Sequence, residues 1–384
     1  MTKVRFIDLK TQQQRIRPSV DAAIKKVLDS GQYIMGEEVF ELERCLAEYV
    51  GVKHCVSAAS GTDALLMALM AYGVGPGDAI FTSPFTFIAT VEVVSLLGAT
   101  PVFVDIDPKT YNLDPLKLEE AIAGLNAVDS GPENCGRLHP KGIIPVDLFG
   151  LPADYDVINS IACDHGLFVL EDAAQSFGGD YKGRRTGSLG DVAATSFFPT
   201  KPLGCYGDGG AVFTDNDALA ELLRSIRVHG KGNDKYDNVR IGVNGRLDTI
   251  QAAILLEKMR IFPGELIERQ RIAGYYNDKL VEFDRLQIVV PYVPQDCQSA
   301  WAQYSILISN RDELQTKMAE QGVPTAIYYP KPLHLQQAYS LYGGCLGSFP
   351  VSEEISQRII SLPMHPYLND TDFNRIFSAF QMMC

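Results

Sequence analysis

Short apolar segments alternate with longer amphipathic segments along the first two thirds of the chain. The short segments predict β-strands, because they are rich in β-branched and aromatic residues and end at turn residues. They are His54–Ser57, Ala79–Thr82, Pro101–Val104, Gly142–Val146, Leu167–Leu170, Ala193–Phe198 and Ala211–Thr214. The amphipathic segments between several of them predict helices, namely Thr62–Tyr72, Ile88–Leu97, Tyr155–His165 and Ala218–Arg227. Near-continuous apolar strands separated by helices are typical of an α/β fold, in which helices cover both faces of a mostly parallel sheet.

The last third of the chain has a different pattern. A long helix is predicted over Arg246–Arg260, ending near Pro263, and a second helix over Leu266–Leu280. The segments after them predict one strand and two helices in α+β order: Tyr304–Ile308, Asp312–Gln321 and Asp370–Met382. We therefore expect a large domain with an N-terminal arm over residues 1–262 and a smaller α+β C-terminal domain over residues 263–384.

The composition is that of a folded, soluble protein. Of 384 residues, 46% are hydrophobic and 21% charged, and the formal net charge at pH 7 is −13. This acidic balance argues against general binding to nucleic acid, whose phosphates require a basic surface. No apolar segment reaches the roughly 18 uncharged residues of a transmembrane helix, and the N-terminus lacks the apolar core of a secretory signal. We expect a cytoplasmic protein that binds neither nucleic acid nor membranes.

The cysteines and histidines show no metal-binding pattern. The eight cysteines are scattered without a CxxC pair, and the six histidines form no HxH or HxxxH pair. Structural and catalytic zinc sites draw their ligands from such closely spaced pairs. The sequence therefore predicts reduced thiols and no metal site.

Three predicted strands end at residues suited to chemistry, and the carboxyl ends of parallel strands are where α/β proteins bind ligands. After His54–Ser57 comes the small-residue turn Ser60-Gly61-Thr62, which precedes a predicted helix. The free N–H groups at a helix start, together with a threonine hydroxyl, suit a phosphate group. The alternative is an ordinary helix N-cap, which Ser60 or Thr62 would provide.

The other two strand ends carry charged residues. One strand continues into Glu171 and Asp172, and a carboxylate at the end of a buried strand is costly unless it meets a partner. A cationic ring nitrogen would be such a partner; a salt bridge or a helix cap is the alternative. The strand Ala193–Phe198 leads to Lys201, ahead of the glycine-rich loop 204–210. Desolvation there would favour the neutral, nucleophilic amine, and the alternative is an ordinary solvated lysine.

Together, a phosphate cradle, an acid for a pyridinium nitrogen and a nucleophilic lysine are what pyridoxal 5′-phosphate (PLP) requires. The order and spacing of SGTDAL at 60–65, EDAAQ at 171–175 and SFFPTK at 196–201 resemble those of fold-type I PLP-dependent transferases. More narrowly, they resemble the DegT/DnrJ/EryC1/StrS family of sugar aminotransferases. Five further segments extend the resemblance over nearly the whole chain: SGQYIMG at 30–36, SPFTFIAT at 83–90, VNGRLDTIQAA at 243–253, YYPKPLHLQ at 328–336 and SLPMHP at 361–366.

The resemblance implies roles around the cofactor ring. Lys201 would form the Schiff base with PLP and move protons during the reaction. Asp172 would pair with the pyridine nitrogen and keep it protonated. Phe87 would lie against one ring face, and Gln175 near the other face or the phenolic oxygen. For Phe87 the alternative is a place in the hydrophobic core.

The resemblance also implies which residues hold the phosphate and cross to a second subunit. Gly61, Thr62 and Ser196 would bind the cofactor phosphate. Asn244 would reach the phosphate of a neighbouring subunit, and Arg246 would cross the same interface to bind a substrate carboxylate. The alternatives are a turn residue for Asn244 and a surface charge at a helix start for Arg246. The expected assembly is a homodimer with composite active sites.

Three further residues, Tyr33, Tyr328 and His334, fall in segments that line the substrate side in family members, and His229, which matches a family position, is a fourth candidate for binding substrate. For Tyr33, Tyr328 and His334 the alternative is a purely structural role in packing, and the role of His229 is less defined. Residues 125–141 are polar and rich in glycine and proline, so they predict an exposed loop inserted before a strand, longer than is common in the family.

The implied activity is transfer of an amino group from L-glutamate to a keto nucleotide-sugar, with pyridoxamine 5′-phosphate as the intermediate cofactor form. The loop PTKPLGCYGDGGA at 199–211 is most similar to that of family members acting at C3 of UDP-2-acetamido-2-deoxy-3-oxo-glucuronic acid, in the synthesis of bacterial surface polysaccharide such as the lipopolysaccharide O-antigen. A 4-keto or another 3-keto nucleotide-sugar is the alternative. A sugar dehydratase of this fold would carry histidine in place of Lys201. A non-catalytic regulatory relative would have lost the lysine, the ring acid or the phosphate residues, and all are present.

Overall fold

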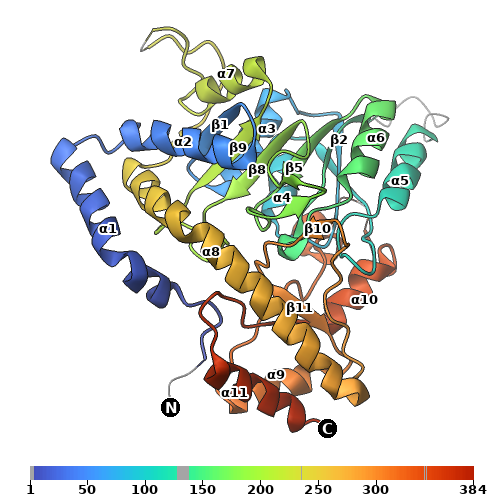
Figure 1. Cartoon of the computed structure of the whole chain (residues 1–384). Coiled ribbons are helices and arrows are strands. Elements are labelled where there is room, and N and C mark those ends of the chain that lie inside the picture. The colour runs from blue at the N-terminus through green and yellow to red at the C-terminus, as the bar shows by residue number, and fades with distance from the viewer. Residues whose placement is uncertain (1–3, 128–137, 235, 341, 343) are drawn as a thin grey trace.

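The computed structural model describes residues 4–127, 138–234, 236–340, 342 and 344–384. Its centre is a seven-stranded sheet with the order β1-β9-β8-β5-β4-β2-β3 (Figure 1). The strands are β1 (His54–Ala58), β2 (Asp78–Thr82), β3 (Thr100–Phe103), β4 (His139–Ile144), β5 (Phe168–Asp172), β8 (Val192–Ser196) and β9 (Gly210–Thr214). Neighbours from β3 to β8 run parallel, and β9 runs antiparallel to β1 and β8. The predicted mostly parallel sheet is confirmed.

Helices cover both faces of this sheet, because successive strand residues point to opposite sides. The covering helices are α2 (Glu37–Val50), α3 (Gly61–Ala71), α4 (Ala89–Leu96), α5 (Pro115–Ala127), α6 (Tyr155–His165) and α7 (Asp217–Ile226). Val56 and Leu170 face the layer of α3, α4 and α7. Their neighbours Cys55 and Val169 face the opposite layer, which α2, α5 and α6 form together with a long helix, α8. The continuous apolar strand segments in the sequence reflect burial on both faces.

Helix α8 spans Thr249–Leu280 without interruption, so the prediction of two helices separated near Pro263 was wrong. A proline inside a helix costs about 3 kcal/mol. Packing on both sides of this proline outweighs that cost, since Phe262 is buried under the sheet and Tyr276 in the core of the C-terminal part. The predicted boundary between residues 262 and 263 falls inside α8, and the division into two domains stays a prediction.

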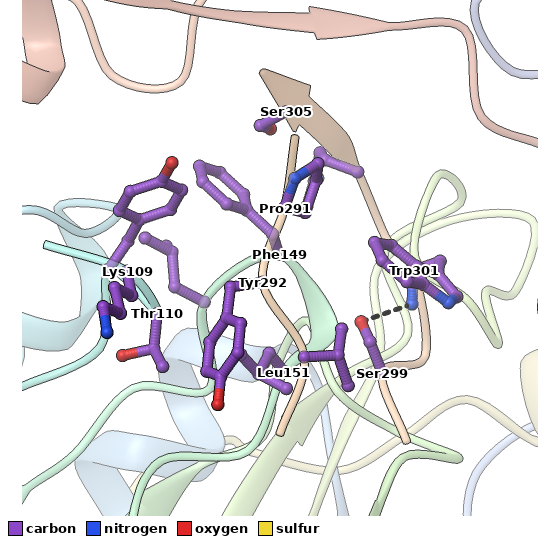
Figure 2. A pocket seen from close by; sticks show the side chains of 13 residues that line it. Lys109, Thr110, Phe149, Leu151, Pro291, Tyr292, Ser299, Trp301 and Ser305 are labelled. Atoms are coloured by element: carbon purple, nitrogen blue, oxygen red, sulfur yellow. Dashed lines mark hydrogen bonds between the residues drawn. The ribbon is translucent and has the colours of Figure 1, made fainter. Parts of the chain in front are cut away.

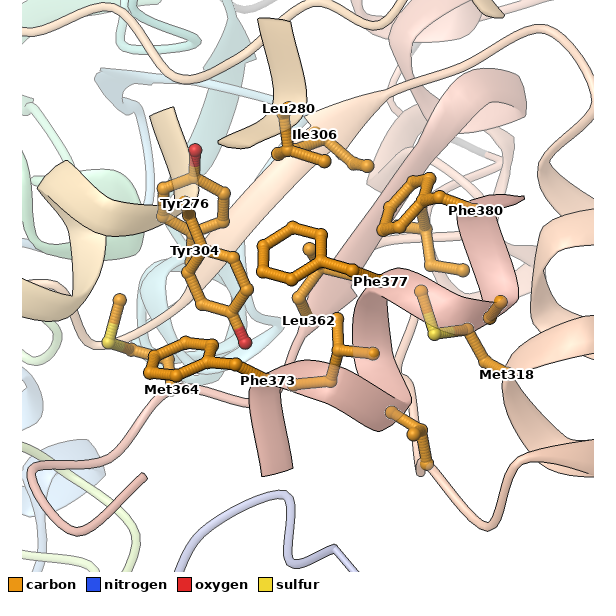
Figure 3. Close-up of a cluster of buried hydrophobic side chains, with 14 of the residues drawn as sticks. Tyr276, Leu280, Tyr304, Ile306, Met318, Leu362, Met364, Phe373, Phe377 and Phe380 are labelled. Atoms are coloured by element: carbon orange, nitrogen blue, oxygen red, sulfur yellow. The ribbon is translucent and has the colours of Figure 1, made fainter. Parts of the chain in front are cut away.

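The C-terminal part combines a two-stranded sheet with helices around an aromatic core. Its elements are β11 (Tyr304–Leu307), α9 (Arg311–Glu320), α10 (Pro350–Arg358), β12 (Ile359–Leu362) and α11 (Asp370–Gln381). Figure 3 shows the rings of Tyr276, Tyr304, Phe373 and Phe377 gathered in this core, with the Tyr276 and Tyr304 centroids 4.6 Å apart. The predicted strand and two helices are confirmed to within about a residue at each end.

Two N-terminal helices occupy the stretch that was predicted as part of the large domain with its arm. Helix α1 (Leu9–Ser30) lies along α8 through Ile16 and Ile254, and α2 follows it. Val4 belongs to the core of the C-terminal part. The predicted loop 125–141 is shortened at both ends by α5 and β4, and its centre lies outside the described residues.

Short elements complete the described chain: β6 (Asp180–Tyr181), β7 (Arg184–Arg185), β10 (Cys297–Gln298), and the 3₁₀ helices η2 (Leu148–Gly150), η3 (Val281–Leu286), η4 (Leu333–Leu335) and η5 (Gln337–Tyr339). In the part of the chain that the structure describes, no helix is long and apolar enough to cross a membrane. The same described residues contain no group of three or more His, Cys, Asp or Glu side chains placed to hold a metal ion.

Candidate active site

The three predicted strand ends meet at one edge of the central sheet. Ala58 at the end of β1 and Ser196 at the end of β8 both pair with Gly210 of β9. Asp172 at the end of β5 pairs with Ala194 of β8. The residues that follow these strands therefore converge on one place, which is where open α/β sheets bind their ligands.

The first component is the turn between β1 and α3. Ser60 caps α3, because its hydroxyl oxygen accepts a hydrogen bond from the Asp63 N–H at 3.0 Å. The N–H groups of Gly61 and Thr62 belong to the first turn, where no intrahelical acceptor exists. Gly61 packs directly on the end of β8, since a Cβ there would lie 2.6 Å from the Cβ of Ser196. The start of α3 thus presents free backbone N–H groups next to the Ser196 hydroxyl, and this cradle of donors suits a phosphate group.

We expect Gly61→Ala to weaken PLP binding by about tenfold or more, because the added methyl group must push α3 away from Ser196 and so distort the cradle. Titration of the purified apo protein with PLP, followed by the cofactor's absorbance, measures the effect. Gly274→Ala is the matched control, because a Cβ at that exposed position of α8 meets nothing within 4 Å. Equal affinity of both variants for PLP would contradict a phosphate cradle at Gly61.

The second component is Asp172, which is buried at 4% exposure. Its carboxylate accepts hydrogen bonds from the Thr90 hydroxyl at 2.7 Å and from the Ala174 N–H at 3.2 Å. Burial raises the pKa of Asp172, while these hydrogen bonds and the charge of Lys201 oppose the rise. Within the described residues Asp172 forms no ion pair, so this buried carboxylate is suited to a cationic ligand atom.

Its neighbour Glu171 points away from this site. The Glu171 carboxylate accepts hydrogen bonds from the Gly187 N–H at 2.5 Å and the Leu189 N–H at 2.8 Å. Burial and the nearby Asp147 raise the pKa of Glu171 well above its usual value. Of the acidic pair, Asp172 faces the ligand edge, and Glu171 stabilises the turn before β8.

The third component is Lys201, in the turn after β8. Its backbone N–H donates to the Phe198 carbonyl at 2.9 Å, which fixes the turn, and its side chain is half-buried. Burial lowers the pKa of Lys201, and the charge of Asp172 opposes this shift. The neutral, nucleophilic fraction of a lysine in this environment is larger than that of a solvated lysine.

Phe87 and Gln175 flank these groups. Phe87 is 53% exposed, although its neighbour Phe85 is buried, so the alternative that placed Phe87 in the core was wrong. The Phe87 carbonyl accepts from the Thr90 N–H, which ties its turn to the residue that holds Asp172. Gln175 is buried, and its amide accepts from the Phe149 N–H at 2.8 Å.

Two residues that the sequence did not single out also belong here. Thr90 is the hydroxyl donor to Asp172, 82 positions away in the chain. Tyr329 accepts a hydrogen bond from the Gln175 amide at 3.3 Å, and burial raises the pKa of its hydroxyl. Both lie inside segments of the resemblance, 83–90 and 328–336, which was the only signal available for them in the sequence.

Asn244 and Arg246 lie on a segment that reaches the same edge. The carbonyl of Gly245, between them, accepts a hydrogen bond from the Ala59 N–H at 2.9 Å, next to the Ser60 cap. The Arg246 guanidinium donates to the Asn244 side-chain oxygen, with its Nε at 3.0 Å. Asn244 is exposed and Arg246 half-buried, so both side chains remain accessible in the single chain.

Two of the residues predicted on the substrate side adjoin this segment. His229 is exposed and has a left-handed backbone (φ 58°), and its N–H donates to the Val243 carbonyl at 3.0 Å. The Tyr33 side chain is also exposed, and its backbone carbonyl accepts from the Thr249 N–H at 2.9 Å. Both therefore lie beside the Asn244–Arg246 segment.

The other two lie in the C-terminal part. Tyr328 is half-buried against Phe6 and Tyr329. His334 is 1% exposed, and its Nε2 lies 3.0 Å from the Glu353 carboxylate. A ring enclosed in this way cannot touch a substrate, so the expected contact is corrected to the structural alternative.

A small cavity of about 20 Å³ lies between Lys109, Leu151 and Pro291 (Figure 2). Phe149, whose N–H is bound by Gln175, lines it together with Tyr292 and Trp301. Neither Lys201 nor Asp172 reaches it. It is space for about one water molecule at the junction with the C-terminal part, not the ligand site.

The arrangement fits PLP. Free helix N–H groups, a buried carboxylate without an ion partner in the described residues, a lysine with a lowered pKa and an exposed aromatic ring supply what the phosphate, the pyridine nitrogen, the aldehyde and the ring face require. Fold and site together define a fold-type I PLP-dependent transferase.

The family is shown by comparison with known proteins. The model of the DegT/DnrJ/EryC1/StrS aminotransferase family matches residues 14–381, and the chain belongs to this family. It is 49% identical to the UDP-2-acetamido-2-deoxy-3-oxo-D-glucuronate aminotransferase of Pseudomonas aeruginosa, over 98% of this chain and 99% of the relative. It is 41% identical to a pleiotropic regulatory protein of Geobacillus stearothermophilus, over 96% and 95%.

Solved structures agree with this assignment. A DegT/DnrJ/EryC1/StrS aminotransferase from Brucella abortus superposes with a TM-score of 0.94 at 53% identity, covering 99% of both chains. The NtdA structure from Bacillus subtilis, determined with bound pyridoxamine phosphate, superposes with a TM-score of 0.89 at 30% identity, over 100% of this chain and 85% of that one. The chain is an aminotransferase that uses PLP as its cofactor.

Proposed function

We propose that the chain transfers an amino group from L-glutamate to C3 of UDP-2-acetamido-2-deoxy-3-oxo-glucuronic acid, in the cytoplasm, during synthesis of surface polysaccharide such as O-antigen. The observation that carries the transamination is the buried Asp172 carboxylate at the strand edge that also presents Lys201. The sugar assignment is supported by the 49% identity to the Pseudomonas aeruginosa enzyme of that name and by the 199–211 loop.

When bound, PLP supplies an electron-accepting ring that stabilises negative charge at the carbon from which a proton is removed. Asp172, held by Thr90 and Ala174, would keep a proton on the ring nitrogen. The Lys201 Nζ would take the proton from the substrate carbon and return it to the cofactor side, because its lowered pKa favours the free amine. The cradle at Gly61 and Thr62 would hold the phosphate and fix the ring's orientation.

Arg246 is proposed to bind the carboxylate of each substrate in turn. Glutamate and a uronic acid both carry a carboxylate, and the planar guanidinium matches either one bidentately. We expect Arg246→Ala to slow both half-reactions, each by about 2–5 kcal/mol, and Arg246→Lys to recover little. Pre-steady-state measurement of each half-reaction tests this, with Arg271→Ala, an exposed arginine of α8 paired with Glu268, as the control. If only the glutamate half-reaction slows, the shared-arginine proposal fails.

We further propose a homodimer in which Asn244 and Arg246 act in the partner's site. Large apolar side chains are exposed around the 228–246 segment and the ligand edge, among them Ile34, Phe198 and Ile241, the last at 86% exposure. Exposed apolar side chains gathered near one site mark an interaction surface. Mixing Lys201→Ala and Arg246→Ala chains tests the arrangement. If the sites are composite, each mixed dimer has one site with both Lys201 and Arg246, and activity is partly restored. If each site lies within one chain, both sites remain defective. Absence of restored activity would therefore refute the proposal.

The substrate test is a screen of keto nucleotide-sugars with glutamate, in which the aminated product is detected by mass. The 3-oxo-uronic acid should react faster than the 3-oxo sugar with CH₂OH at C5 and faster than 4-keto sugars. Turnover of a 4-keto sugar alone would support the alternative. PLP binding without turnover of any sugar would support a regulatory protein of the same fold.

A further inference from the structure

The loop that follows Lys201, Pro202–Gly210, is fastened to helix α8 by two side chains. The Nζ of Lys258 donates to the Gly204 carbonyl at 2.5 Å. The Oε1 of Gln251 accepts a hydrogen bond from the Tyr206 N–H at 2.9 Å. Lys258 follows Gln251 by seven positions, so both lie on one face of α8, two turns apart.

Burying the Lys258 ammonium at this position is energetically costly. Its side chain is 2% exposed, and among the described residues no carboxylate lies within ion-pair distance of it. The nearby Glu265 binds Gln12 and Tyr367 instead. The ammonium is compensated by the Gly204 carbonyl and by the Tyr206 ring, whose centroid is 4.6 Å away. Burial lowers the pKa of Lys258 to about 8. An apolar side chain of similar length would bury at lower cost, so stability alone does not account for a lysine here.

The fastened loop is rigidly joined to Lys201. A Cβ at Gly204 would lie 2.5 Å from the Phe198 carbonyl, so the loop folds back directly on the turn that begins at Phe198. The Cys205 N–H donates to the Phe197 carbonyl at 2.8 Å, and the Lys201 N–H donates to the Phe198 carbonyl. The loop and Lys201 are therefore bound to the carbonyls of two adjacent residues, Phe197 and Phe198, so we expect a shift of Gly204 away from α8 to be passed on to the Lys201 backbone.

We propose that Gln251 and Lys258 are positioning residues for Lys201, which hold the 202–210 loop against α8 so that the lysine amine stays aimed at the ligand edge beside Asp172. The proposal rests on Lys201 being the PLP lysine and not on which sugar is aminated. Helix α8 begins at Thr249, three residues after Arg246. The helix that fastens this loop therefore begins close in sequence to the Arg246 segment.

The test measures the loop and the lysine separately in the full chain. In Lys258→Met and Gln251→Leu, amide hydrogen exchange of the apo protein should become about tenfold faster at Tyr206, which is the scale of one lost hydrogen bond. After addition of PLP, the rate of covalent attachment to Lys201, trapped by borohydride reduction of the C=N bond and read by mass, should fall about tenfold. Lys258→Arg and Gln251→Glu keep a donor and an acceptor, so both should stay within threefold of wild type.

Lys279→Met is the matched control, because this lysine of α8 is paired at the surface with Glu282 and should change neither readout. Slower attachment with an unchanged loop exchange, or both readouts within twofold of wild type, would overturn the proposal. If Lys258→Met fails to fold, Gln251→Leu decides, since Gln251 is half-buried and leaves the ammonium in place. Both readouts need only the protein and PLP, so a failed sugar assignment leaves them unaffected.

Discussion

Replacing Lys201 with alanine is expected to abolish turnover, with kcat/KM lower by about 10⁴-fold or more. In the proposed mechanism the same Nζ would carry the covalent link to PLP and move the proton at the substrate carbon, and proton transfer alone contributes roughly 10²–10⁴-fold. Its half-buried position and lowered pKa make it the nucleophilic amine at the strand edge. Steady-state turnover with glutamate and the keto sugar measures the loss.

The fold of this variant should be intact, because the lysine makes no ion pair among the described residues and its turn is held by backbone hydrogen bonds. Its melting temperature as apo protein should lie within a few degrees of wild type, and PLP should still bind noncovalently through the 60–62 cradle. Lys279→Ala, at an exposed position of α8, is the control for loss of a lysine. Turnover at the wild-type rate, in protein free of contaminating enzyme, would remove Lys201 from the mechanism.

The central sheet could be predicted from the sequence because its strands are buried on both faces. Such strands are short apolar segments bounded by turn residues, and all seven were located to within about three residues. The continuity of α8 through Pro263 could not be predicted, because helix propensity includes the cost of proline but not the burial of Phe262 and Tyr276 on either side of it. The two-residue strands, such as Arg184–Arg185, are too short to show the hydrophobic pattern from which a strand can be predicted.

The ligand edge could be predicted because each of its three components lies at the end of a strand or a few residues after it. Asp172 is the last residue of β5, Gly61 and Lys201 follow β1 and β8, and the sheet brings those ends together. Residues that act through contacts distant in the sequence were missed. Thr90 and Tyr329 are defined by hydrogen bonds across 82 and 154 positions, and no local pattern distinguishes them from neighbouring threonines and tyrosines.

His334 shows the opposite error, in which a motif position was given a substrate role. Its segment resembles that of family members, but the ring lies enclosed between Glu353 and Phe349. The partner of its ring, Glu353 in helix α10, lies 19 positions further along the chain and outside the motif, so the motif does not reveal that the ring is enclosed. Burial therefore separates residues of one motif into those that face the site and those that support it.

Asp172→Asn should bind PLP and yet turn over about 10²–10⁴-fold more slowly than wild type. If Asp172 holds the ring nitrogen as proposed, the neutral amide would no longer keep that nitrogen protonated, and removing one member of a buried charge pair costs about 3–5 kcal/mol. The amide also faces two donors, the Thr90 hydroxyl and the Ala174 N–H, with a single acceptor oxygen. Rapid-mixing absorbance with glutamate alone measures the first half-reaction. Thr90→Val, which removes only the donor to Asp172, should cost about tenfold.

The Asp172→Asn substitution, which is expected to lower turnover, should not lower the stability of the apo protein. Because burial raises the folded-state pKa of Asp172 above its unfolded value, the stability it contributes is present at low pH and lost as pH rises through the folded pKa. Asparagine does not titrate, so at pH 7 the apo variant should melt at or above the wild-type temperature, and the difference should narrow on acidification. PLP should then raise the melting temperature of wild type more than that of the variant, because its protonated ring nitrogen can form an ion pair with the Asp172 carboxylate but not with the neutral asparagine amide. Near-normal turnover together with an equal gain from PLP would assign the ring nitrogen to another residue.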